Sequence, residues 1–214
     1  GDFQILVFAP STVQEMVDLV SDAFDLGDKY RMPAMILADG MLGQMMEPVT
    51  LPEGGKQLPE KPWAASGHHG ERPHNVVNSL YLTPQALENL VRERYERYAV
   101  IKENEQRAEE YLTEDAEIVI VAYGASSRVA RSAVNMARKE GLQVGMIRPI
   151  TLWPFPTKAI EKNIPGKVFL CVEMCMGQMV DDVRLVVNGR APVEFYGRTG
   201  GMNSSPSASF WEIA

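Results

Sequence analysis

The stretch from Lys167 to Gly201 constrains the fold of this chain more than any other. It opens with KVFLCVE, an apolar run rich in β-branched residues that predicts a strand buried on both faces and ending at Glu173. Gly177 then opens GQMVDDVRLVV, in which apolar residues recur at helical spacing. The short strand PVEFY and the turn GRTGG follow. This order predicts α/β layering, in which functional sites gather at the carboxyl ends of strands.

The same pattern extends upstream. It comprises the strand EIVIVAYG, a helix over Ser127–Glu140 that ends at Gly141, the strand QVGMIR and a short helix in PFPTKAIEKNI. Together these segments predict a compact unit over Ala116–Gly201, with β-α-β-α-β-α-β order. The tail after Met202 is enriched in Ser and Pro, and we expect it to fray.

A smaller α/β unit opens the chain. Phe3–Ala9 (FQILVFA) predicts a buried strand, and Ser11 with Gln14 three residues later predicts a helix N-cap. An apolar stripe continues this helix to about Tyr30, and AMILAD predicts a second strand that ends at Asp39. Two parallel strands and one helix leave the faces and edges of the sheet uncovered. We therefore expect strands from elsewhere to complete it, which makes the chain part of a larger assembly.

A long irregular segment and a helix separate the two units. Met41–Leu82 shows no periodicity, and at roughly forty residues it far exceeds the usual connection. It is therefore a functional loop, an arm that wraps a subunit, or disordered. Thr83 followed by Pro84 is typical of a helix start, and we expect this helix to reach about Leu112. Its narrow apolar stripe and many charges are typical of a connector with a solvated face.

Composition narrows the possible partners. The net charge of −7 disfavours a nucleic-acid partner, whose phosphates would be repelled. No apolar run approaches the roughly 20 residues of a membrane span, and Gly1-Asp2 does not open a signal peptide. Two cysteines in 214 residues favour a reducing compartment. We expect a cytoplasmic protein with no membrane contact.

Several residues at predicted strand ends are candidates for a site. Pro10 and Ser11 follow the first strand, and Asp39 and Gly40 follow the second, where an α/β crevice opens. A plainer alternative is that Ser11 only caps a helix and Asp39 only closes a turn.

A possible anion site lies in the second unit. YGASSR places glycine and serines, Ser126 among them, between a strand and a helix, where backbone amides can bind an anion or simply form a helix cap. Arg198 in GRTGG could contact an anionic partner or form an internal ion pair. The absence of GxGxxG and of a Walker lysine disfavours a nicotinamide dehydrogenase and a P-loop.

Metal and redox chemistry have little support. His68, His69 and His74 match no zinc spacing and read as ordinary loop histidines. Cys171 and Cys175 form CxxxC rather than the redox motif CxxC, so we expect Cys171 in the core and Cys175 near an interface. We predict no metal site and no catalytic residue in this chain.

Six of the twelve methionines gather just after predicted strands. Methionine fills irregular cores and adaptable interfaces, so we expect part of this set to make subunit contacts, with core filling as the alternative. The six are Met41, Met45, Met46, Met174, Met176 and Met179.

The segment VEMCMGQMVDDVRLVVNGRAPVEFYGRTGG resembles the closing domain of the alpha subunit of 2-oxoacid:ferredoxin oxidoreductases. The likeness continues through FAPSTVQEMVDL, ILADGMLGQMMEPV, NVVNSLYL and MIRPITLWPFP, in order over nearly the whole chain. NVVNSLY and RPITLWPFP look most like the branch that acts on 2-ketoisovalerate (3-methyl-2-oxobutanoate). Cys175 departs from the pattern, because the resemblance implies Asn there, and any polar contact of that Asn is in doubt.

The resemblance implies an architecture. The fold is α/β, with a partial thiamine-pyrimidine-domain β-α-β unit, a long linker helix and a transketolase C-terminal-like α/β domain. Residues 1–42 are then the second half of the pyrimidine-binding domain, and residues 43–112 are the long loop and linker helix. Residues 113–201 form the transketolase C-terminal-like domain, and residues 202–214 are a tail.

The resemblance also implies a function. The complete enzyme would oxidatively decarboxylate a 2-oxoacid on thiamine diphosphate, form an acyl-coenzyme A and reduce ferredoxin. Pro10, Ser11, Asp39 and Gly40 would line the funnel to the cofactor, and this chain would supply scaffold and subunit interface without turnover of its own. The alternative is a non-catalytic α/β module that binds a ligand or a protein partner.

Cofactors are expected in the complete complex, none wholly within this chain. The Asp39-Gly40 motif lacks the paired asparagines that would hold Mg²⁺ with it, so a beta subunit is expected to carry the diphosphate and Mg²⁺ site. The glutamate that activates the cofactor is expected before Gly1. An iron–sulfur cluster needs about four cysteines, and this chain has two. Because ferredoxins are acidic, we expect ferredoxin to dock on other subunits.

Overall fold

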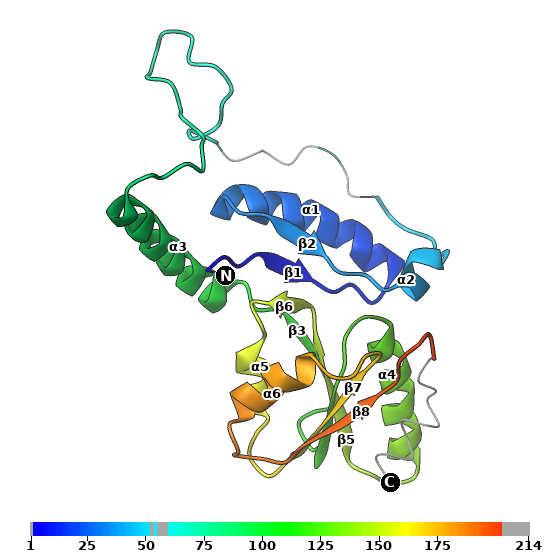
Figure 1. The fold of residues 1–214 in the computed structure, drawn as a ribbon. Coiled ribbons are helices and arrows are strands. Elements are labelled where there is room, and N and C mark those ends of the chain that lie inside the picture. Colours follow the sequence, from blue (N-terminus) through cyan, green and yellow to red (C-terminus); the bar gives the residue numbers. More distant parts are fainter. Residues whose placement is uncertain (1, 52–53, 55–59, 203–214) are drawn as a thin grey trace.

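A computed structural model of the chain describes residues 2–51, 54 and 60–202. It confirms the α/β class: helices pack on two separate sheets that contain parallel strands (Figure 1). The predicted fraying of residues 203–214 lies outside the described residues, as do residues 52–53 and 55–59 of the long irregular segment. Within the described part of the chain, no helix is both long and apolar enough to cross a membrane.

The first unit is built on a three-stranded sheet. Strand β1 (Leu6–Phe8) pairs in parallel with β2 (Ala34–Ile36) and antiparallel with β6 (Thr151–Trp153). The expectation that only outside strands would complete this sheet is therefore wrong at one edge, which a segment distant in sequence fills. Along the other edge, β2 has no strand partner among the described residues.

Helix α1 (Val13–Tyr30) begins one residue later than predicted. The N-cap is Thr12, whose side chain accepts a hydrogen bond from the Glu15 backbone N at 3.1 Å. Ser11 instead donates from its backbone N to the Glu15 carboxylate at 2.7 Å. The prediction that Ser11 and Gln14 cap this helix is thus wrong. Thr12 and Glu15, one residue further along, form the capping pair.

The connector helix α3 (Pro84–Asn104) is shorter than predicted. The expected end near Leu112 is wrong, because Ala108–Tyr111 forms the edge strand β3, which pairs antiparallel with β5 (Val144–Pro149). Between helix and strand, the Glu105 carboxylate accepts hydrogen bonds from Tyr30 Oη at 2.5 Å and Lys29 Nζ at 2.9 Å. These bonds tie the C-terminal end of α3 to the C-terminal end of α1.

The second unit is a five-stranded sheet in the order β3-β5-β4-β7-β8. All neighbours except β3 run parallel. Its remaining elements are β4 (Ile118–Val121), α4 (Gly124–Lys139), α5 (Thr157–Lys162), β7 (Val168–Glu173), α6 (Met179–Val187) and β8 (Val193–Gly197). Helix α4 starts three residues before the predicted Ser127, because Gly124 adopts φ +56° and turns the chain into the helix.

Apolar clusters cover both faces of this sheet. Alternating residues of β4 and β7 point to opposite faces, so Val119 and Phe169 pack toward α5 and α6, whereas Ile120 and Leu170 pack toward α4. Between the units, residues 41–82 contain only the short helix α2 (Gly40–Gln44) among those described, in line with the lack of periodicity.

Candidate functional site

The topology of the larger sheet points to one location for a site. The chain passes from β4 to β5 on one side and then crosses to β7 on the other, so the connections diverge between β4 and β7. In open parallel sheets, ligands bind in the crevice outside the carboxyl ends of the strands at such a switch point. Tyr123 follows β4 there, and Glu173 ends β7.

Glu173 anchors one wall of this crevice. Its side chain is buried, with 1% of the residue exposed. One carboxylate oxygen accepts from the Met179 backbone N and the other from the Val180 backbone N, both at 3.0 Å. The carboxylate therefore caps the N-terminus of α6, where the helix dipole favours a negative charge. Glu173 holds the turn over residues 174–178 in place.

The groups beside Glu173 are protonated donors at neutral pH. The Cys175 thiol donates to the Glu173 carboxylate at 3.3 Å, and burial and this bond raise the pKa of Cys175. Burial also raises the pKa of Tyr123, and the charges of Glu173 and Asp39 raise it further. Burial raises the pKa of Cys171, inside β7, to about 12. That Cys171 is buried confirms the prediction that it lies in the core, and neither thiol is an activated nucleophile.

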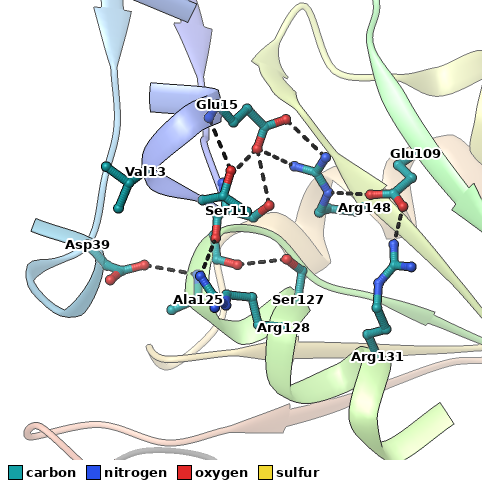
Figure 2. Close-up of polar contacts among 12 residues, drawn as sticks. Ser11, Val13, Glu15, Asp39, Glu109, Ala125, Ser127, Arg128, Arg131 and Arg148 are labelled. Atoms are coloured by element: carbon teal, nitrogen blue, oxygen red, sulfur yellow. Dashed lines mark hydrogen bonds and ion pairs between the residues drawn. The ribbon is translucent and has the colours of Figure 1, made fainter. Parts of the chain in front are cut away.

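Asp39, just after the end of β2, joins the two units. One carboxylate oxygen accepts from the Leu42 backbone N at 2.8 Å and so caps α2. The other accepts from the Ala125 backbone N at 2.9 Å, in the first turn of α4 (Figure 2). A Cβ at Gly124 would lie 3.2 Å from this second oxygen, so glycine permits the close approach. One carboxylate thus caps a helix in each unit.

The structure brings most of the predicted site residues to the junction of the units. Pro10 and Ser11 are buried at the end of β1, and the Ser11 carbonyl accepts from Arg128 at 3.4 Å. Ser126 is buried in α4, one residue after the amide that binds Asp39. Gly40 begins α2. Arg198 lies at the other side of the crevice, where its backbone N donates to the Glu173 carbonyl at 3.1 Å.

An ion-pair network that sequence reasoning missed lies next to this junction. Arg148 is buried and makes two hydrogen bonds of 3.0 Å to Glu15 and one of 2.8 Å to Glu109, which also pairs with Arg131 (Figure 2). Burial alone would lower the pKa of Arg148, but the Glu15 and Glu109 carboxylates raise it. The sequence signal for this network was Arg148, a charged residue at the end of the apolar strand QVGMIR. Its partners Glu15 and Glu109 could not be identified from the sequence, because they lie far from it along the chain.

These residues line a cleft between the units. Its volume is about 640 Å³, and its wall includes Thr12 from α1 and Ser127, Arg128 and Arg131 from α4. Arg128 pairs with Glu47 at 2.9 Å, and the Glu47 carboxylate also accepts from the Val13 backbone N at 3.1 Å. Each arginine at this cleft therefore has a carboxylate partner within the chain.

In the described part of the chain, the histidines lie in the long irregular segment, whereas the cysteines lie in and just after β7. Among the described residues, no group of three or more His, Cys, Asp or Glu side chains could hold a metal ion. His68 instead accepts from the Gly70 backbone N at 3.1 Å, with its ring 4.0 Å from the ring of His74. Cys171 and Cys175 are the chain's two cysteines, fewer than a cluster needs.

The methionines divide between core and surface. Met179 is buried in the cluster beneath α6, whereas Met46 and Met176 are 98% and 80% exposed. The Met45 sulfur accepts a weak hydrogen bond from Arg128 at 3.6 Å. Core filling thus explains Met179, and the subunit contact predicted for the exposed members stays a prediction.

Comparison with protein families gives two matches that together span most of the chain. Residues 1–119 match the thiamine diphosphate-binding domain of pyruvate flavodoxin/ferredoxin oxidoreductases. Residues 116–208 match core domain II of pyruvate:ferredoxin oxidoreductase.

Individual relatives agree with these matches. The ketoisovalerate oxidoreductase subunit VorB of Methanothermobacter marburgensis is 49% identical over 203 residues, which cover 94% of this chain and 57% of the relative. The 2-oxoglutarate synthase subunit KorA of Methanocaldococcus jannaschii is 32% identical over 231 residues, covering 94% of this chain and 61% of the relative. This chain therefore spans somewhat more than half the length of these relatives.

Solved structures share the fold. The 2-oxoglutarate:ferredoxin oxidoreductase of Magnetococcus marinus, with 2-oxoglutarate, coenzyme A and succinyl-CoA bound, aligns with a TM-score of 0.74 at 19% identity, over 100% of this chain and 42% of that one. A split-gene transketolase aligns with a TM-score of 0.55 at 13% identity, over 98% of this chain and 56% of that one.

Proposed function

The chain belongs to the pyruvate:ferredoxin oxidoreductase family, and we propose that it forms part of the alpha subunit of an oxidoreductase that acts on 2-ketoisovalerate. The observation that carries this proposal is the 49% identity to a ketoisovalerate oxidoreductase subunit over 203 residues. The complete enzyme would decarboxylate the 2-oxoacid, transfer the acyl group to coenzyme A and reduce ferredoxin. We place it in the cytoplasm, given two cysteines in 214 residues.

Within that enzyme, we assign this chain the roles of scaffold and crevice wall. We propose that residues 1–42 are the second half of the pyrimidine-binding domain and residues 113–201 a transketolase C-terminal-like domain, joined by residues 43–112. Pro10, Ser11, Asp39 and Gly40 would line the funnel to the cofactor. Because Asp39 already binds two helices, its role there is to fix the wall rather than to move a proton.

The cofactors would be held largely by other parts of the complex. Thiamine diphosphate supplies the carbanion chemistry when it is bound. The donor groups described here do not fit Mg²⁺ or an iron–sulfur cluster, so we assign both to other subunits, together with the docking of ferredoxin. Arg198 at the crevice is our candidate for contact with an anionic group of coenzyme A. Ser126, the other residue predicted to contact an anion, is buried in the first turn of α4 beside the amide that Asp39 already binds, so we assign it no ligand.

The alternative is a non-catalytic α/β module that binds a ligand or a protein partner, and its version with an anionic ligand at the start of α4 has less support. It requires free amides at the start of α4, but the Ala125 amide is already bonded to Asp39 at 2.9 Å. The helix therefore carries its own negative cap, which weakens its attraction for an outside anion.

Turnover with different 2-oxoacids tests the proposal. The complete complex, supplied with coenzyme A, Mg²⁺, thiamine diphosphate and an artificial electron acceptor, should reduce the acceptor faster with 2-oxoisovalerate than with 2-oxoglutarate or pyruvate. The purified chain alone should give no steady reduction. Turnover by the chain alone would contradict the role as a scaffold, and preference for another 2-oxoacid would contradict the substrate.

A further inference from the structure

An apolar cavity lies at the C-terminal end of α1, beside the described segment over residues 60–82 (Figure 1). Its volume is about 500 Å³, within the range of roughly 300–1,000 Å³ that is usual for small-molecule sites. None of the residues that line it belongs to the cleft between the units. Apolar side chains form most of its wall: Ala23 and Phe24 of α1, Met32 and Pro33 before β2, and Trp63 and Val77 of the segment.

Two charged residues, Asp28 and Arg31, also line this cavity. The Asp28 carboxylate is paired with Lys61 Nζ. The Arg31 guanidinium lies over the Trp63 ring, 4.9 Å from its centroid, and its side chain makes no hydrogen bond or ion pair with any other described residue. Because the guanidinium is planar, stacking on a ring leaves its N–H donors available to an anion. The described wall therefore offers one cation without a carboxylate partner, in apolar surroundings.

The backbone at Arg31 is a second sign of a binding role. Arg31 caps the C-terminus of α1 in the left-handed conformation, with φ 49° and ψ 52°. Glycine or asparagine usually occupies this position, because a larger side chain is strained there. Strained residues of this kind cluster at ligand sites, where the side chain is needed for binding. Arg31 is also exposed, so a ligand from solvent can reach it.

An apolar wall with one available cation selects a class of ligand. We propose that this cavity binds a small aromatic monocarboxylate, whose carboxylate accepts hydrogen bonds from Arg31 and whose ring packs between Phe24 and Trp63. The guanidinium fork matches a carboxylate with two parallel hydrogen bonds. An aromatic body suits a wall that contains two aromatic rings. Phe24 is 74% exposed, so a bound ring would also remove apolar surface from water. The site is separate from the crevice and does not depend on which 2-oxoacid the complex uses.

Three small molecules test this class of ligand. 3-Phenylpropanoate, 3-phenylpropanamide and acetate are titrated separately into the full chain at pH 7 and constant ionic strength, and tryptophan fluorescence is followed, because Trp63 lies in the cavity wall. We expect saturable binding of 3-phenylpropanoate. Binding should be at least about tenfold weaker for the amide, which lacks the charge, and for acetate, which lacks the ring. No saturable binding, or an affinity for either analogue equal to that of 3-phenylpropanoate, would overturn the proposal.

Two arginine variants separate the site from general charge effects. Arg31→Gln should weaken binding of 3-phenylpropanoate about tenfold or more and leave binding of the amide unchanged, because it removes the charge but keeps the apolar wall. Arg94→Gln makes the same change of charge on α3, outside this cavity, and is the matched control. It should change little. Equal losses in the two variants would show a long-range charge effect and contradict contact with Arg31.

Phe24→Ser tests the apolar wall. It should weaken binding of the acid and of the amide in parallel, by about threefold or more, because both carry the ring. Phe3→Ser, at a phenylalanine that is 67% exposed and outside this cavity, is the matched control and should leave both unchanged. Equal behaviour of the two variants would contradict packing on Phe24. Sedimentation that shows a dimer of the full chain, lost in Phe24→Ser, would assign the cavity to a second copy and overturn the proposal.

Discussion

The two sheets of this chain differ in how completely they are covered. The five-stranded sheet has buried apolar clusters on both faces. The three-stranded sheet has one cluster, where Leu6 and Phe8 face α1 and α3. On its other side, Met35 and Leu37 stay 44% and 42% exposed. The sheet of the larger unit is therefore covered by apolar residues on both faces, whereas the sheet of the smaller unit is covered on one face only.

Polar contacts with the larger part of the chain partly compensate for the small apolar core of the smaller unit. Four carboxylates of the smaller unit and its loop bind groups of the larger part of the chain: Glu15 with Arg148, Asp22 with Arg107, Asp39 with Ala125, and Glu47 with Arg128. The Asp39 contact involves a residue proposed to line the funnel to the cofactor, and the Glu15 contact lies at the cleft between the units. A destabilising substitution in the larger unit should therefore lower the stability of both units. A destabilising substitution in the smaller unit should lower the stability of that unit alone.

Loss of Arg148 should have the largest effect. Arg148→Met leaves Glu15 and Glu109 as partly buried carboxylates without their main partner, so we expect the free energy of unfolding to fall by about 3 kcal/mol. Urea denaturation measures it. Arg92→Met is the matched control and should cost about 0.5 kcal/mol or less, because its pair with Glu88 is exposed. A loss for Arg148→Met as small as that of the control would sink the idea that this network joins the units.

Glu173→Gln should have the next largest effect. The glutamine amide would turn an NH₂ group toward backbone N–H donors at the start of α6, which should cost about 2 kcal/mol. Because Glu173 lies in the larger unit, the thermal unfolding of both units should shift together. Glu194→Gln, an exposed change on the neighbouring strand β8, should leave the midpoint almost unchanged. A shift confined to one unit would contradict the dependence of the smaller on the larger.

Asp39→Asn should act locally and more weakly. Asparagine still caps α2 through its oxygen, but its NH₂ group would face the Ala125 N–H, so we expect a cost of about 1 kcal/mol. The Ala125 amide should exchange with solvent faster, while the amides of β7 keep their protection. Asp181→Asn, exposed on α6, is the control. Unchanged exchange at Ala125 would show that this bond does not hold the units together.

The pH dependence should be the smallest effect. Burial would raise the pKa of Glu109, but the Arg148 and Arg131 guanidinium groups lower it below its usual value of 4.5. The ionised Glu109 therefore stabilises the fold above about pH 4.5, and this contribution is lost as the pH falls through the lower, folded-state pKa. Denaturation between pH 6 and pH 3 should show stability falling with pH, less steeply in Glu109→Gln. An equal slope in the variant would assign the effect to other carboxylates.

The sequence predicted the elements that are apolar and regular. The strands that became β4 and β7 were visible because each buries most of its side chains, which imposes a continuous apolar run. Helix α6 was visible because its buried residues recur at helical spacing. Strand β3 was missed because Ala108–Tyr111 (AEEY) is a partly exposed edge strand made of residues that also suit a helix. Strand β6 was missed because it has three residues and depends on pairing with β1.

The candidate site was predictable only in part. Asp39 and Ser11 were identified because they end predicted strands, and parallel strands bring such ends together. That Asp39 would reach the start of α4, 86 positions away, depends on how the units pack, which local patterns do not encode. The Arg148–Glu15 pair, 133 positions apart, was hidden for the same reason.

Native-state hydrogen exchange tests the contrast between the two units most directly. Amides of β4 and β7, covered on both faces, should exchange only when the whole chain unfolds. Amides of β1 and β2 should exchange at a lower free energy, and Arg148→Met should lower it further. Equal protection of the two sheets, unaffected by that substitution, would contradict the view that the larger unit holds the smaller one in place.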